Sequence, residues 1–164
     1  MLFGLFSYCR RQKNRDKIQA AFRAVKLGNL TILNTLLNTE LDINCRRKDG
    51  DYTLLHYAII STNMVNLDIM QPIIQYLLEN DALPNNYYHI NNAFFNPLHS
   101  ATRKKLPSVV KLLLEYDADT SFRNDKNKTA QDYVHDAQDN RGQETREALE
   151  QQEKISNQFR YSIL

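Results

Sequence analysis

The chain has 164 residues, of which 42% are hydrophobic and 24% are charged, and its formal net charge is +2. These values predict one folded domain with enough apolar side chains for a core, and they exclude a wholly disordered chain. Residues 1–50 hold ten Lys or Arg against four Asp or Glu, a balance of +6 that falls short of a nucleic-acid-binding signature. Cys9 and Cys45 make no disulfide framework, and the sequence has no Cys/His cluster for zinc. We therefore expect a reducing compartment, no metal and no cofactor.

The N-terminal segment, residues 1–16, is apolar up to Cys9 and basic after it. A secretory signal peptide has its charge before a longer apolar run, so we expect none here. No segment reaches the roughly 18 apolar residues that span a bilayer. Two interpretations of the segment stay open. Either it folds back over the exposed core edge of the domain, which we favour, or residues 1–15 insert shallowly into a membrane.

Helical periodicity dominates the rest of the chain. Ile18–Leu37 and Val109–Tyr116 repeat apolar residues with a period of about 3.6 residues, which is typical of helices. Only four Gly and four Pro argue against a turn-rich β-sandwich. We therefore predict an all-α fold.

The chain also repeats itself. Thr53–Ala58 (TLLHYA) and Asn96–Ala101 (NPLHSA) share a pattern, and the helical segments that follow them end alike, at Tyr76–Ala82 (YLLENDA) and Leu112–Asp119 (LLLEYDAD). Weaker copies begin near Ala21 and Asn127. Four copies near a period of about 33 residues indicate helical hairpins that must stack to bury their apolar faces.

This pattern resembles that of ankyrin repeats, whose signature Thr-Pro-Leu-His-x-Ala differs at one position from each strong copy. The resemblance implies an ankyrin-repeat solenoid of about four helix-turn-helix units with short β-like fingers. Asp81 and Asp117 stand where the family has a left-handed Gly, a conformation that Asp tolerates. The expected divisions are an extension over 1–16, repeats over about 17–48, 49–85, 86–124 and 125–150, and a tail over 151–164.

The histidines of the two strong copies invite a catalytic or metal-binding interpretation, which we reject. The resemblance gives His56 and His99 a structural role, in which they and the neighbouring Thr53 or Asn96 bond backbone groups at the helix start. Cys45 lies near His56 in sequence, but no third group to orient a nucleophile is apparent. We therefore predict that the chain is not an enzyme.

The second repeat holds about seven residues more than the third between its paired helices, around Ser61–Pro72. This surplus predicts a longer turn or an added helical turn, with Pro72 at the first position of the next helix. We favour a tolerated surface insertion, since long loops cost little entropy. The alternative is a protrusion that contacts a partner.

Ankyrin fingers commonly contact ligands together with the concave face of the first helices, so the resemblance places the binding surface there. The finger Asn85–Phe95 is rich in aromatic residues, and we expect Tyr87 or Tyr88 to be an exposed anchor and Phe95 to be buried. The other fingers are basic and suit carboxylates. The predicted partner-binding residues are Arg46, Arg47, Lys48, Tyr52, Tyr57, Tyr87, Tyr88, His89, Phe94, Arg103, Lys104 and Arg123.

We therefore expect a monomeric, cytoplasmic, non-enzymatic module that binds another protein and not nucleic acid. The Glu-rich segment Gln143–Lys154, with apolar residues after it, resembles the secretion signal of type IV effectors from intracellular bacteria. That resemblance implies a small effector, secreted into the host cytoplasm, that binds a host protein. The alternative is a regulator that binds another bacterial effector or enzyme.

Overall fold

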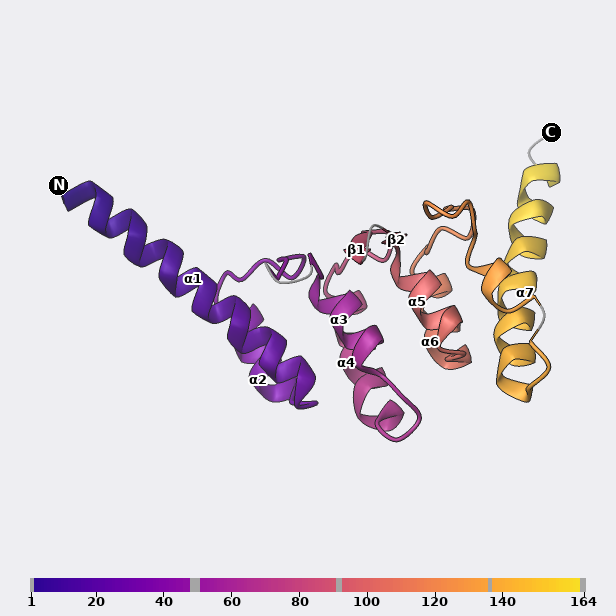
Figure 1. The fold of residues 1–164 in the computed structure, drawn as a ribbon, viewed down its shortest axis with the longest axis horizontal. Helices are drawn as coiled ribbons and strands as arrows, with labels where there is room; N and C mark the ends of the chain where they lie inside the picture. Colours follow the sequence, from indigo (N-terminus) through magenta and orange to yellow (C-terminus); the bar gives the residue numbers. More distant parts are fainter. Residues whose placement is uncertain (1, 48–50, 91–92, 136, 163–164) are drawn as a thin grey trace. The chain divides into compact units, whose positions relative to one another are not determined.

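The structure, a computed structural model, describes the backbone of residues 2–47, 51–90, 93–135 and 137–162. It describes the side chains of residues 14–47, 51–88, 95–135 and 137–155. Helical hairpins fill two units, one ending at Ala82 and one beginning at Leu83 (Figure 1). The predicted all-α class with short β-like fingers is confirmed.

The first hairpin joins α1 (Leu2–Lys26) to α2 (Leu30–Leu37) through a turn at Gly28, whose φ is +69°. Asn29 caps α2, because its side chain accepts a hydrogen bond from the Ile32 amide at 2.9 Å. The 25 residues of α1 span about 37 Å, and the N-terminal part of the helix runs past the end of α2 (Figure 1). Residues 2–16 are thus the first turns of an uninterrupted helix. The favoured prediction, that this segment folds back over the first repeat, is wrong.

The second hairpin pairs α3 (Leu54–Ser61) with α4 (Leu67–Glu79). Thr53 caps α3, and α3 packs against both α1 and α4. The helices bury one shared apolar face, which is the main source of stability in a repeat hairpin. Its fully buried members include Phe22, Val25, Leu33, Leu54, Leu55, Ile59, Ile74 and Leu77.

Pro72 lies inside α4 and not at its first position, so that prediction is wrong. The turn before the helix is held by asparagine side chains: Asn63 Oδ1 accepts from the Val65 amide at 2.9 Å, and Asn66 Oδ1 accepts from the Asn63 amide at 2.6 Å. These bonds let the helix begin at Leu67, so the surplus residues lengthen both turn and helix. Pro72 then forfeits one helical hydrogen bond.

The second unit begins with the finger, in which β1 (Tyr88–Ile90) and β2 (Ala93–Phe95) form an antiparallel pair. The helices α5 (Pro97–Arg103) and α6 (Pro107–Glu115) follow, each with proline at its start, where no amide partner is lost. Among the described residues of the fourth predicted repeat, the 3₁₀ turn η1 (Gln131–Tyr133) stands where its first helix was expected. The long α7 (Asn140–Ser162) packs on α6 and continues through most of the residues predicted as a tail.

Aspartate ends the second helix of both strong repeats, as predicted. Asp81 and Asp117 have φ values of 66° and 59°, in the left-handed region. In each case the following alanine amide bonds back to a leucine carbonyl, Ala82 to Leu77 at 2.9 Å and Ala118 to Leu113 at 3.0 Å. These bonds satisfy carbonyls that the helix end leaves free. Within the described part of the chain, none of the helices is long and apolar enough to cross a membrane.

Candidate functional site

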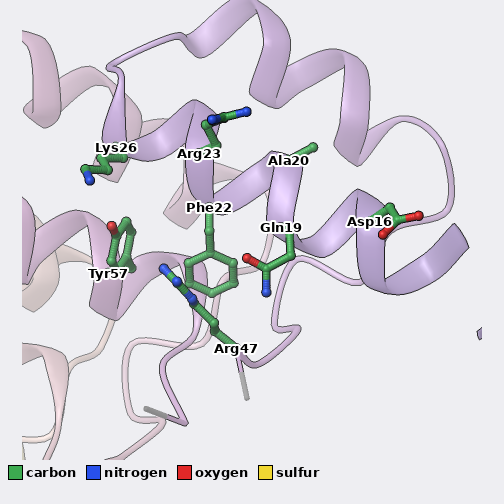
Figure 2. A pocket seen from close by; sticks show the side chains of 8 residues that line it. All are labelled: Asp16, Gln19, Ala20, Phe22, Arg23, Lys26, Arg47 and Tyr57. Atoms are coloured by element: carbon green, nitrogen blue, oxygen red, sulfur yellow. The ribbon is translucent and has the colours of Figure 1, made fainter. Parts of the chain in front are cut away.

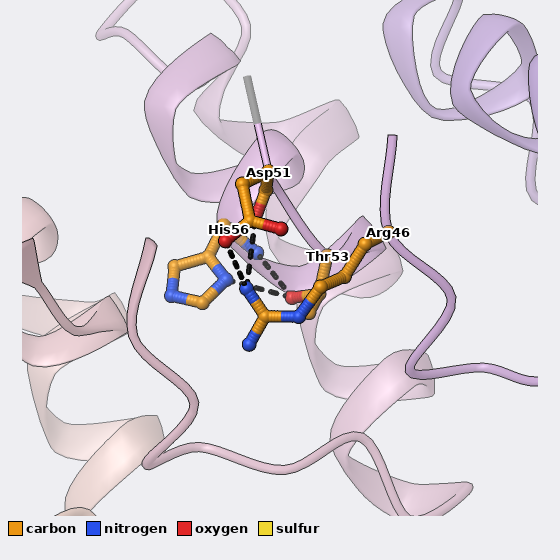
Figure 3. A network of polar contacts seen from close by, with 4 residues as sticks. All are labelled: Arg46, Asp51, Thr53 and His56. Atoms are coloured by element: carbon orange, nitrogen blue, oxygen red, sulfur yellow. Dashed lines mark hydrogen bonds and ion pairs between the residues drawn. The ribbon is translucent and has the colours of Figure 1, made fainter. Parts of the chain in front are cut away.

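The first finger, residues 46–52, is closed by two backbone hydrogen bonds. The Arg47 amide donates to the Tyr52 carbonyl at 2.9 Å, and the Asp51 amide donates to the Arg47 carbonyl at 3.0 Å. Arg46 Nη1 reaches across the finger to the Asp51 carbonyl at 3.0 Å and to the Asp51 carboxylate at 2.8 Å (Figure 3). Beside this ion pair, Thr53 and His56 bond each other at the start of α3. The two backbone hydrogen bonds of Arg47 therefore fix the position from which its side chain extends.

Arg47 lies against two aromatic rings from different helices. Its guanidinium carbon is 5.9 Å from the centroid of Phe22 on α1 and 5.8 Å from that of Tyr57 on α3 (Figure 2). The two rings meet edge to face, with centroids 5.3 Å apart. Phe22 is only 1% exposed, so its ring is held by the core. A guanidinium at such distances gains about 0.5–1 kcal/mol per ring, and more where water is excluded.

These residues belong to a groove of about 470 Å³ in the first unit, which we call the first-repeat groove. Positions 16, 19, 20, 23 and 26 of α1 form one wall, because residues three and four apart share a helix face. Three cations and one carboxylate line the groove. Its lining residues are Asp16, Gln19, Ala20, Phe22, Arg23, Lys26, Arg47 and Tyr57.

Two of the predicted partner-binding residues, Arg47 and Tyr57, meet in this groove. Arg46 pairs with Asp51, and burial raises the pKa of the half-buried Tyr52 phenol. Lys48 lies outside the described residues.

Helix α1 contributes residues to the groove that were not predicted from the sequence. The polar residues Gln19, Arg23 and Lys26 were not among the predicted partner-binding residues. Their shared face was readable from the spacing, but their meeting with Arg47 depends on the tertiary packing of Phe22 against Tyr57.

In the second finger, Tyr88 is not an exposed anchor. Its side chain is 0% exposed, and its hydroxyl lies 2.9 Å from Ser100 Oγ, so its assignment to the binding surface is corrected. Tyr87 is 49% exposed and keeps the predicted role of anchor open. Phe95 is buried, as predicted. His89 and Phe94 pair across the two strands, but their side chains lie outside the described residues.

The other predicted cations of the second unit are engaged separately. The Arg103 guanidinium lies 5.0 Å from the Phe95 ring centroid. Burial, followed by the nearby charge of Arg103, lowers the pKa of Lys104. Arg123 Nη1 donates to the Asn127 carbonyl at 2.9 Å.

A cavity of about 570 Å³ in the second unit is a weaker candidate. Its Lys105 pairs with Asp139, and the side chain of Asp139 also accepts a hydrogen bond from the Gly142 amide at 2.8 Å. These two bonds, with that of Lys105 first, lower the pKa of Asp139. The Asp139 carboxylate thus caps the start of α7 and pairs with Lys105. The remaining lining residues are Lys104, Asn140 and Arg141, with no aromatic side chain among them.

Both repeat histidines have the structural role that was predicted. His56 and His99 are fully buried, and each donates its amide to the side chain of the capping residue, Thr53 or Asn96. His99 Nε2 also lies 2.9 Å from the Lys128 carbonyl, which ties the start of α5 to the next finger.

Cys45 lacks the properties of a nucleophile. Burial, followed by the nearby charge of Asp42, raises the pKa of its thiol to about 12. A reactive cysteine needs the opposite shift, since the thiolate is the attacking species. Within the described ranges, no three His, Cys, Asp or Glu side chains gather in an arrangement that would hold a metal ion.

The family model for ankyrin repeats (3 copies) matches residues 21–124, which is more than half of the chain. A search of curated proteins found no match. Ankyrin repeats generally mediate protein–protein interaction, and the family is typically non-enzymatic. With three repeats matched and with hairpins capped at Thr53–His56 and Asn96–His99, the chain belongs to the ankyrin-repeat family.

Proposed function

We propose that the chain binds another protein through the first-repeat groove, without catalysing a reaction. The observation that carries this proposal is the Arg47 guanidinium resting on Phe22 and Tyr57, because it joins the finger to α1 and α3 in one surface. Arginine and aromatic residues are enriched among the residues that dominate binding energy. Packing already fixes these side chains, so binding requires little further ordering.

The dipole of α1 explains the position of some of the cations in the groove, but not of all of them. Arg23 and Lys26 lie in the last turn of α1, where positive charge offsets the helix dipole. Arg47 comes from another element and lies outside that turn, so the dipole does not account for its position. The convergence of charges from two elements favours a binding surface over a merely solvated helix end.

Photo-crosslinking tests this proposal. A benzophenone amino acid at the exposed position Gln19 should capture a protein from host or bacterial lysate. The same group at Thr31, exposed on α2 outside the groove lining, is the matched control and should capture much less. Equal capture from both positions, or none from Gln19, would contradict the assignment of the groove.

The finer hypothesis is that the chain is a bacterial effector whose partner is a host protein. It is supported by the Glu-rich segment Gln143–Lys154, which the structure describes as part of α7 with Glu144, Glu147 and Glu153 exposed. The alternative is a regulator of another bacterial protein. The source of the protein crosslinked at Gln19 separates the two, because each lysate is presented alone.

A further inference from the structure

The charges of the first-repeat groove are unevenly placed along α1. Asp16 lies toward the start of the wall, and Arg23 and Lys26 lie at its end. Arg23 and Lys26 are exposed, and neither side chain forms an ion pair or hydrogen bond with any residue that the structure describes. The C-terminal dipole of α1 offsets about half a positive charge there, so the cations still prevail. The groove therefore has a positive end and an acidic end.

The size of the groove limits what it holds. Positions 16 to 26 of α1 cover about 15 Å, which equals the length of about four or five residues of extended peptide. Gln19 lies between the charged ends and offers both a donor and an acceptor to a peptide backbone. The Phe22 ring is covered and offers no open face for stacking a nucleic-acid base.

We infer that the groove binds an acidic peptide segment of the partner, with two or more Asp or Glu carboxylates at Arg23 and Lys26, in the positive field to which Arg47 contributes. This inference rests on the proposed function and names the chemistry of its ligand. An arginine guanidinium pairs with a carboxylate through two hydrogen bonds, and Arg23 is exposed and able to make them. Arg47, whose guanidinium lies near Phe22 and Tyr57, adds positive charge beside it. Asp16 repels a carboxylate at the other end, so the segment binds in one direction.

The test is an NMR titration of the full chain with blocked 12-residue peptides. One peptide carries Glu residues in its C-terminal half, a second carries them in its N-terminal half, and a third has Gln in their place. We expect amide shifts confined to Gln19, Arg23, Lys26, Arg47 and their neighbours. One Glu peptide should bind at least about five-fold more tightly than its reversal, and binding should weaken at least about ten-fold from 50 to 300 mM salt. Equal shifts with the Gln peptide, or shifts elsewhere, would overturn the inference.

Matched variants separate the ligand chemistry from the site itself. The pair R23Q/K26Q removes two charges from the groove, and the control pair K111Q/K126Q removes two exposed charges elsewhere. The variant Q19W fills the groove from an exposed position and leaves the core alone. We expect R23Q/K26Q and Q19W to lose the Glu peptide and K111Q/K126Q to keep it.

Each failure has its own result. The protein identified by crosslinking at Gln19 is then tested in a pull-down with each variant. If it still binds R23Q/K26Q but not Q19W, the site is correct and the acidic ligand is wrong. If it binds both variants, the proposed function of the groove fails as well. If an oligouridylate shifts the groove residues at lower concentration than the Glu peptides do, the ligand is a nucleic acid and the inference is overturned.

Discussion

Nδ1 of His99 lies 2.6 Å from Oδ1 of Asn96, the same oxygen that accepts the His99 amide at 2.9 Å. In the second repeat, the Thr53 hydroxyl accepts the His56 amide and is also able to donate to Nδ1, 2.7 Å away. The Lys128 carbonyl can only accept a hydrogen bond, so neutral His99 carries its ring proton on Nε2 and has none on Nδ1. The carbonyl oxygen of the Asn96 side chain has no proton to donate to Nδ1. Nδ2 of Asn96 is buried and makes no hydrogen bond with the described residues. As a helix cap, Asn96 therefore carries a cost in folding free energy that Thr53 does not.

Replacing Asn96 by threonine should stabilise the chain. The hydroxyl restores the donor to His99 Nδ1 and removes a buried amide nitrogen that lacks a partner, a gain of about 1 kcal/mol. The reverse change, T53N, is the matched control and should destabilise by a similar amount. Urea unfolding of both variants measures the two changes. A destabilised N96T would show that Asn96 has partners the threonine cannot replace.

Acidification should weaken the fold through His99. Burial lowers the pKa of His99 below its ordinary value of 6.5, although the Lys128 carbonyl and the Asp132 charge act in the opposite direction. Above 6.5 the imidazole is neutral in both states, so its contribution to stability is complete. As pH falls below 6.5 the unfolded chain binds the proton first, and stability is lost until the folded pKa is reached.

The measurement is urea unfolding between about pH 7.5 and about pH 5, for the wild type and for H99Q. The difference between the two curves isolates His99 from the other histidines. Hydrogen bonds from the amide and the hydroxyl of Thr129 lower the pKa of Asp132, which stays ionised through this range. A difference that does not change with pH would contradict the prediction.

The contacts of Arg47 should contribute to folding as well as to binding. R47K keeps the charge but loses the planar group over Phe22 and Tyr57, so we expect a loss of about 1 kcal/mol in unfolding free energy. R123K is the control, because the Arg123 side chain is exposed and its guanidinium donates to the backbone carbonyl of Asn127. Equal losses for both variants would mean that the rings contribute nothing.

The repeats were predictable because their signals are local. Thr53 caps α3 within its own turn, and Asp81 ends α4 through bonds to the residues just before it. Such contacts depend on residues that are close in sequence, so the local sequence motif is enough to predict the helices and their ends. The predicted place of Pro72 was wrong because the preference of proline for the first helical position was outweighed by the turn that Asn63 and Asn66 build.

The binding residues were less predictable because they depend on packing. Tyr87 and Tyr88 are adjacent, and only the pairing of Tyr88 with Phe95 decides which of them faces inward. Arg23 became part of a groove because a finger some twenty residues away places Arg47 beside it. Composition shows that a finger is basic or aromatic, but not which side chain meets another repeat.

Cys45 should resist thiol reagents in the folded chain. With a pKa of about 12, roughly one thiol in ten thousand is ionised at pH 8, and the side chain is 8% exposed. In a C9S background, reaction with a chromogenic disulfide should be at least about 100-fold slower in buffer than in denaturant. Fast labelling in buffer would reopen the enzymatic interpretation.

Gly28 should tolerate no side chain. Its φ of +69° costs about 1–2 kcal/mol for a residue with a Cβ, and that Cβ would lie 2.3 Å from Ile69 Cγ2. G28A should therefore destabilise the fold in two ways, through backbone strain and through a clash with α4. The clash arises because the turn of the first hairpin packs against the inserted part of the second hairpin.

A double-mutant cycle separates the two causes. I69A alone should cost little, because Ile69 is 55% exposed, yet it should relieve the clash in G28A/I69A. The double variant should then be less destabilised than the sum of the single changes, with the remaining loss near the backbone term of about 1–2 kcal/mol. Strict additivity in thermal unfolding would mean that Ile69 moves aside freely and that the backbone conformation alone demands glycine.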